Sequence, residues 1–383
     1  MDGTTQRLDS PSPRLQRLLD YIDADPTNLA LIGDAAKRAA DDGRYVECDT
    51  LLNRYEQLQP LAPALMNLRA VSALSQGRSS EARATFAALL LEHPDDPFLA
   101  YNLAYASALL DDYATAVDLL TDPVLDAQPD AIVLRMQCMH HLGMLDAAID
   151  LGKQHAEHAI VGGQVAGMLA TLLFDAAEGD QAEAFAMRAP AAAGSLTVLG
   201  LLALERDDLG QAMQLFRKAM EADPASGRAH LGEGLGRLAQ QDFNTAAMSL
   251  DKAAALLPGH AGTWLTSGWA HVLNGDLDTA RDRFERALDI DRGFAEALGA
   301  IAVTDVYQHR IDDAQRRTQA ALRLDRECLS AIMAQGLLLQ RAGQTDRSVE
   351  LRLALLNHPL GGEQGPTIAQ IMAKRSLRDA ANH

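Results

Sequence analysis

Ten consecutive helix-sized segments share two slots that nine of them fill with small residues, and most of these segments start 34 residues apart. In the segment that starts at Ala261, for example, the eighth position is Gly268 and the twentieth is Ala280. A fixed period of this length indicates stacked repeats, in which each unit packs mainly against its neighbours. The segments start at residues 29, 63, 97, 129, 163, 193, 227, 261, 295 and 329.

Each segment has the pattern of two antiparallel helices joined by a tight turn. Small residues in the two slots allow the helix axes to approach where they cross, and larger apolar residues such as Trp264 and Phe284 surround them. Proline stands where the second helix must stop, at positions 26, 60, 94, 224 and 258. Glycine is expected to end the first helix at Gly43, Gly77, Gly275 and Gly343.

This pattern resembles the tetratricopeptide repeat. The stretch Ala261–Arg292 carries Trp264, Gly268, Gly275, Ala280, Phe284 and Ala287 at the spacing of that family. The resemblance extends over about residues 29–360. It implies an all-α, right-handed superhelical solenoid of about ten antiparallel helix pairs, a scaffold that serves many tasks.

The domain organisation follows from the spacing of the segments. We expect an N-terminal tail and capping helix in residues 1–28, with the helix at Arg14–Asp25, and a first repeat array in residues 29–162. Residues 163–192 form a degenerate repeat, interpreted as a joint that is either a bend, a hinge or a dimerisation surface, or as an ordinary short repeat. A second array occupies residues 193–360. Residues 361–383 combine a flexible break with a helix that either caps the array or is a detachable recognition helix carrying Lys374, Arg375 and Arg378.

The net charge of −18 is concentrated in the first part of the chain. Residues 1–226 hold 33 acidic and 16 basic residues, whereas residues 227–383 hold 19 and 18. An acidic surface disfavours nucleic acid and favours a basic protein segment as partner. Arginines such as Arg281, Arg310 and Arg317 interleave with acidic residues, and we expect solvated helix faces with local ion pairs.

Composition also bears on location. Three cysteines, Cys48, Cys138 and Cys328, form no paired motif and are expected to be small buried side chains in a reducing compartment. No apolar run at the start resembles a signal peptide, and the uncharged stretch of residues 159–174 is too short to cross a bilayer comfortably. These features predict a cytoplasmic protein, and its Ala- and Asp-rich composition suggests a bacterial source.

No pattern of residues points to catalysis, a cofactor or a metal ion. The run of residues 232–236 resembles a dinucleotide loop only in its glycines, because it lies inside an expected helix. Four histidines lie close in sequence but lack the spacing of a helical metal site, namely His140, His141, His155 and His158. The sequence therefore predicts a protein that is not an enzyme.

In the resembled family, first helices line the concave face through positions 2, 5, 6, 9, 12 and 13. On that register the first array offers amides and tyrosines, which can hold a peptide backbone and supply flat apolar anchors. The predicted site residues there are Asn67, Tyr101, Asn102, Tyr105, Arg135 and Met139. In the second array the same face is apolar and suits either core packing or an amphipathic helix, with Leu235, Trp269 and Tyr307 as the predicted residues.

These observations predict a non-catalytic scaffold or adaptor that binds segments of partner proteins in its groove. The alternative is a cytosolic chaperone or assembly factor for a secretion or envelope-building system. An RNA-binding helical repeat is disfavoured by the acidic surface. The sequence names neither the partner nor the oligomeric state.

Overall fold

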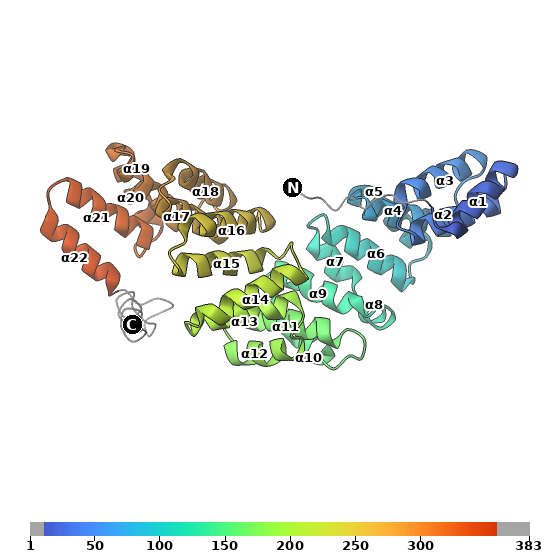
Figure 1. Ribbon diagram of the computed structural model, residues 1–383, viewed down its shortest axis with the longest axis horizontal. Helices are drawn as coiled ribbons and strands as arrows, with labels where there is room; N and C mark the ends of the chain where they lie inside the picture. Colours follow the sequence, from blue (N-terminus) through green and yellow to red (C-terminus); the bar gives the residue numbers. More distant parts are fainter. Residues whose placement is uncertain (1–10, 358–383) are drawn as a thin grey trace. The chain divides into compact units, whose positions relative to one another are not determined.

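The computed structural model describes residues 11–357, and this part of the chain consists of helices and turns without a strand (Figure 1). Ten helix pairs follow one another, which confirms the predicted all-α repeat architecture. The first helices are α2 (Leu29–Asp41), α4 (Pro63–Ser75), α6 (Pro97–Ala108), α9 (Asp130–His141), α11 (Gly162–Asp175), α13 (Ala193–Glu205), α15 (Gly227–Ala239), α17 (Ala261–Leu273), α19 (Ala295–Tyr307) and α21 (Leu329–Arg341).

The second helix of each pair begins after a short turn. These helices are α3 (Tyr45–Leu58), α5 (Ser79–Glu92), α7 (Tyr113–Leu119), α10 (Leu145–His155), α12 (Gly179–Arg188), α14 (Leu209–Ala222), α16 (Phe243–Leu256), α18 (Leu277–Ile290), α20 (Ile311–Leu324) and α22 (Thr345–Leu356). The chain divides into two compact units, residues 1–189 and residues 190–383, which we call unit 1 and unit 2. Both helices of the segment 163–192 belong to unit 1, and its role as a joint stays a prediction.

The small residues of the eighth slot lie against large side chains of the second helix. A Cβ atom added to Gly268 would lie 2.3 Å from the ring of Phe284, and one added to Gly200 would lie 2.6 Å from the ring of Phe216. Both rings are completely buried. Glycine in this slot therefore sets how closely the two helices of a repeat approach.

One residue in the turn of every repeat has a left-handed backbone conformation. Glycine occupies this place in five repeats, with φ between 72° and 84°, and these include the four glycines predicted to end a first helix. The other five repeats have residues with a side chain at the same place, with φ between 59° and 64°: Asp111, Ala177, Asp207, Gln241 and His309. The turn geometry is thus common to all ten repeats, although the glycine is not.

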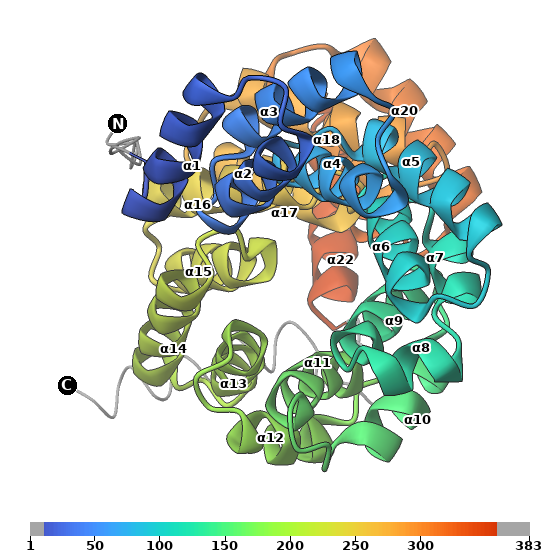
Figure 2. The same ribbon diagram turned by 90° about the vertical axis from the view of Figure 1, so that its right-hand side faces the viewer.

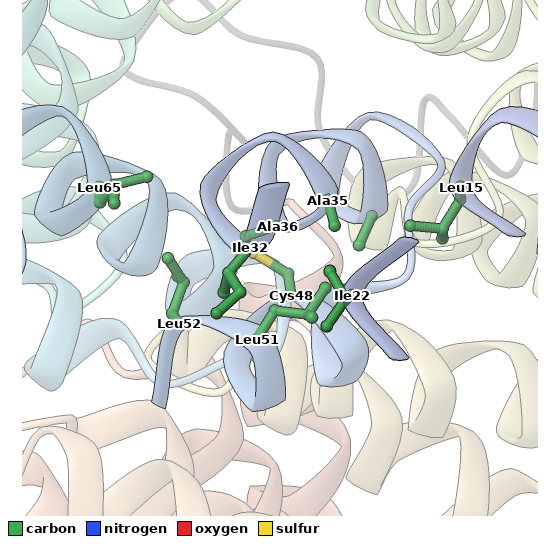
Figure 3. Packing of buried hydrophobic residues seen from close by; sticks show 10 residues of the cluster. Leu15, Ile22, Ile32, Ala35, Ala36, Cys48, Leu51, Leu52 and Leu65 are labelled. Atoms are coloured by element: carbon green, nitrogen blue, oxygen red, sulfur yellow. The ribbon is translucent and has the colours of Figure 1, made fainter. Parts of the chain in front are cut away.

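The expected helix at Arg14–Asp25 runs as α1 (Pro13–Ala24) and covers the start of the first repeat. Its Leu15 and Ile22 are buried in one apolar cluster with residues of the first repeat such as Ile32 and Leu52 (Figure 3). Ser12 caps its N-terminus by accepting a hydrogen bond from the amide of Leu15. The predicted helix at the other end of the chain lies outside the described residues.

One helix, α8 (Asp122–Ala127), departs from the two-helix pattern. It follows α7, which has only seven residues, and lies beside α9 (Figure 1, Figure 2). Pro123 cannot supply the backbone N–H that a continuous second helix would need there, so the helix breaks and restarts.

Candidate partner-binding surface

An exposed apolar row runs along the first helix of the third repeat, α6. Phe98 is 56% exposed, Tyr105 is 41% exposed and Leu109, the residue that caps the helix, is 49% exposed, while Tyr101 is half-buried. The spacing of three, four and four residues places all four on one face of the helix. We call these residues, Phe98, Tyr101, Tyr105 and Leu109, the α6 row.

Within the α6 row, the aromatic rings of Tyr101 and Tyr105 are in contact with each other. Their rings stack with centroids 6.4 Å apart and an interplanar angle of 23°. Burial raises the pKa of Tyr101, and the nearby Asp130 adds to the effect. Two stacked tyrosines with fixed positions are suitable anchors, because a partner need not order them on binding.

The sequence predicted Tyr101 and Tyr105 but missed Phe98 and Leu109. Phe98 occupies position 2 of its repeat and Leu109 occupies position 13. Both positions belong to the set that lines the concave face in the resembled family. The signal was therefore present in the sequence.

The two predicted asparagines lie on neighbouring first helices, Asn102 on α6 and Asn67 on α4. Asn102 follows Tyr101 on α6 and is half-buried. Asn67 lies on α4, and its side-chain oxygen is buried without a hydrogen-bond partner in the described part of the protein. Each carboxamide supplies both donor and acceptor atoms to a ligand.

Arg135 and Met139 are less available than the prediction assumed. The guanidinium of Arg135 lies 3.4 Å from a carboxylate oxygen of Asp122 on α8, and Met139 is only 7% exposed. Asp122 belongs to α8, which packs against α9, so this helix accounts for the engagement of Arg135. We therefore base the functional argument below on α6 and leave Arg135 and Met139 out of it.

The surroundings of this surface are acidic. Unit 1 contains 28 acidic and 13 basic residues. Asp34 and Asp41 on α2 and Asp130 on α9 are all exposed. Negative potential of this kind attracts basic segments and repels phosphate backbones.

In unit 2 the predicted residues lie on separate first helices. Trp269 is half-buried, and its ring meets that of Phe284 edge-on, with centroids 5.5 Å apart. It also packs against a cluster of Ala302, Val303 and Ala334, so much of its area serves the core. Leu235 is half-buried, whereas Tyr307 is 43% exposed.

Three arginines of unit 2 form ion pairs with one carboxylate, one of them across a repeat boundary and two within the repeat. Asp305 on α19 is completely buried and contacts three guanidinium groups, from Arg281, Arg310 (2.7 Å) and Arg317. The expectation of solvated ion pairs is wrong at this site, because the carboxylate lies where neighbouring helices meet. A buried carboxylate needs such partners to offset the loss of water.

A second carboxylate joins three helices. Asp251 on α16 accepts hydrogen bonds from Ser267 (2.6 Å) on α17 and from Arg283 (2.7 Å) on α18, and it pairs with His271 (3.1 Å). Burial alone would raise the pKa of Asp251, but these donors outweigh it and lower the pKa to about 2. This carboxylate therefore contributes to the cohesion of the array.

The two histidines at the end of α9 contact neighbouring side chains. His140 pairs with Asp175 at 2.8 Å, and His141 stacks on Tyr113 with centroids 4.3 Å apart. Over this range no group of three or more His, Cys, Asp or Glu residues is placed to hold a metal ion. The cysteines are buried free thiols, as predicted, and burial raises the pKa of Cys48 to about 11.

Comparison with protein families decides the kind of repeat. Two family models described as tetratricopeptide repeat match the chain, one over residues 49–132 and 231–293 and the other over residues 193–226. The chain is a tetratricopeptide repeat protein. The matched residues lie in both units, and the repeats form a scaffold of the general kind that binds other proteins.

Solved structures share the fold at low sequence identity. The human IFIT1 dimer with m7Gppp-AAAA is 14% identical, with a TM-score of 0.52 over 89% of this chain and 92% of that chain. The APC/C hetero-tetramer Cut9-Hcn1 is 14% identical, with a TM-score of 0.46 over 88% and 82%. The crystal structure of MamA is 21% identical, with a TM-score of 0.35 over 40% and 89%. None of the curated proteins compared with the chain matches it.

None of the helices within residues 11–357 combines the length and the apolar composition that crossing a bilayer requires.

Proposed function

We propose that this tetratricopeptide repeat protein is a non-catalytic scaffold that binds an apolar, basic segment of a partner protein on the α6 row. The observation that carries the proposal is the row itself, in which Phe98, Tyr105 and Leu109 are each at least 41% exposed on one helix face. Large apolar side chains aligned on one face of a solenoid helix lose water contact when a partner covers them.

The stacked tyrosines are expected to carry much of the binding energy. Their rings are already fixed, so binding costs little side-chain entropy. Removing a central aromatic anchor typically costs about 2 kcal/mol or more. Asn102, beside Tyr101, would donate to and accept from the backbone of the bound segment.

Charge supports a basic partner. The excess of acidic residues in unit 1 would speed the association of a segment rich in Lys and Arg, and salt would weaken this effect. The human IFIT1 structure contains m7Gppp-AAAA, so an oligonucleotide belongs in the test. The free thiols suit a reducing compartment, and we place the scaffold in the cytoplasm.

Peptides that vary charge and apolar content independently test the proposal. We expect fluorescence anisotropy to show binding of an apolar-basic peptide, weaker binding of its acidic counterpart and none of a single-stranded RNA of matched length. Tyr101→Ala with Asn102→Ala should weaken peptide binding at least about tenfold. Circular dichroism should show unchanged helix content.

Tyr21→Ala is the matched control, since Tyr21 is 58% exposed but lies on α1. Unchanged affinity in the double variant would refute the site, and preference for the acidic peptide or the RNA would refute the charge argument. A stoichiometric complex with the partner supports a scaffold. Suppressed aggregation of the partner without a stable complex would instead support the chaperone or assembly-factor alternative.

A further inference from the structure

The turn of the fourth repeat differs from the other nine turns. The residue before the second helix, at position 16 of a repeat, is charged or carries an amide in the nine other repeats. In the fourth repeat this residue is Met144, whose side chain makes no capping hydrogen bond. Aspartate caps the second helix from this place in four repeats, by accepting a hydrogen bond from a backbone amide: Asp112, Asp208, Asp242 and Asp276.

Met144 is exposed instead of packed in the core. It is 42% exposed, and Leu142, two residues before it, is 41% exposed. We call these two residues the turn patch. A departure from local preference that leaves large apolar side chains in water is expected where a protein binds another molecule. Position 14, where Leu142 stands, is polar in six other repeats: Asp42, Gln76, Arg206, Gln240, Asn274 and Gln308.

The turn patch lies beside the end of the α6 row. His141, directly before Leu142, stacks on Tyr113 of the third repeat with ring centroids 4.3 Å apart and an interplanar angle of 4°. The hydroxyl of Tyr113 donates to Asp111 at 2.7 Å, in the turn that follows Leu109. Leu109 and His141 both occupy position 13 of their repeats. The surface of the α6 row therefore continues over the stacked rings to the turn patch.

The chemistry around the turn patch matches that around the α6 row. Asp111 and Asp146 are both exposed, and Asp146 lies in the first turn of α10. Basic residues of a partner would thus meet negative charge at both places. The flexible thioether of Met144 can adapt to an apolar side chain of varied shape.

We propose that the partner segment bound on the α6 row continues past Leu109 and places a second apolar side chain on the turn patch. This inference rests on the proposed function and adds a second anchor to it. The α6 row is about 16 Å long at about 1.5 Å per helical residue, and the neighbouring first helix lies about 10 Å further on. An extended chain rises about 3.3 Å per residue, so about eight residues reach both anchors, whereas about five cover the row alone.

Peptides of two lengths test the second anchor. The short peptide has about five residues, alternately apolar and basic, and two long peptides add about three residues ending in leucine at the N-terminus or at the C-terminus. We expect fluorescence anisotropy to show that one long peptide binds at least about tenfold more tightly than the short one, because a second apolar side chain leaves water. The same long peptide ending in serine should bind like the short one.

Leu142→Gln with Met144→Asn gives this turn polar residues like those of other repeats. Asparagine can also cap α10, so urea unfolding should show a stability equal to or above that of the wild type. The variant should abolish the tighter binding of the long peptide and leave the affinity for the short one unchanged. The matched control is Leu91→Gln with Met187→Asn, at residues of α5 and α12 that are 86% and 64% exposed, and it should change neither affinity.

The proposal is overturned if neither long peptide binds more tightly than the short one, or if the tighter binding persists in Leu142→Gln with Met144→Asn. An equal loss in the control variant also overturns it. Tyr101→Ala with Asn102→Ala should weaken the binding of both lengths. If that variant leaves both affinities unchanged, the α6 row is not the site and the proposed function itself fails. If it weakens both but length has no effect in the wild type, only the second anchor is refuted.

Discussion

Two glycines in the same slot of different repeats should respond in opposite directions when replaced by alanine. At Gly268 the new methyl group would lie 2.3 Å from the ring of Phe284, which is completely buried and cannot move aside. At Gly336 the nearest heavy atom outside the helix backbone is 3.8 Å away, which is an ordinary contact. The substitution is identical in chemistry and in helix position.

The magnitudes follow from two opposing effects. Replacing glycine by alanine inside a helix stabilises it by about 1 kcal/mol. Overpacking a filled core costs about 1–3 kcal/mol. Gly336→Ala should therefore raise the free energy of unfolding by about 0.5–1 kcal/mol, whereas Gly268→Ala should lower it by about 1 kcal/mol.

Tryptophan fluorescence during urea unfolding provides the assay. The two tryptophans, Trp264 and Trp269, both lie on α17, so the signal reports on unit 2. Adding Phe284→Leu to Gly268→Ala gives this repeat the same two residues that the third repeat has in these positions, Ala104 and Leu120. The double variant should recover part of the lost free energy of unfolding. If Gly268→Ala stabilises as much as Gly336→Ala, the glycine slot does not limit helix approach, and the packing argument is wrong.

Two further predictions concern the carboxylates of Asp251, which is partly buried, and Asp305, which is completely buried. The pKa of Asp251 in the folded protein is about 2, below its ordinary 3.8, so its contribution to stability is present above about pH 4 and is lost as the pH falls toward 2. In the wild type, the free energy of unfolding should fall by up to roughly 2 kcal/mol over this pH range because of Asp251, and Asp251→Asn should abolish this part of the decrease. Urea unfolding at several pH values measures it. Asp305→Asn should cost about 3 kcal/mol or more, because three arginines lose their buried charge partner. Arg316→Ala, at a side chain that is 77% exposed, should cost less than about 0.5 kcal/mol in the same measurement, and equal costs would contradict this reasoning.

Repeat boundaries were predictable because several spaced residues fix each one. The first helices begin at Leu29, Pro63 and Pro97, the residues at which the periodicity places them. The 34-residue period predicts one continuous second helix where the structure has α7 and α8. The break was not predicted, although Pro123 is a local signal for it.

The site was less predictable, because exposure depends on what packs against each helix. Tyr105 is exposed as the register implies, but Met139 is buried and Arg135 is engaged by Asp122 of the unexpected α8. Similarly, the position of Asp305 gives no hint from sequence that neighbouring helices enclose it. Periodicity assigns a residue to a face, whereas neighbours decide how much of it reaches solvent, and the partner-binding role of the face stays a prediction.

The left-handed turn residues bear on how such a protein can change over evolution. Ala177, with φ of 59°, has a left-handed backbone conformation. This conformation is about 1 kcal/mol less favourable for a residue with a side chain than for glycine. Five repeats retain this strain, and four of these turns lie outside the repeat that carries the α6 row, at Ala177, Asp207, Gln241 and His309. Each of these four therefore offers a separate route to a more stable array. Because stability in a solenoid is approximately a sum over repeats, mutations at these turns can compensate for costly changes elsewhere. Stabilising substitutions at these turns would therefore allow the proposed binding surface to change in sequence while the array stays folded.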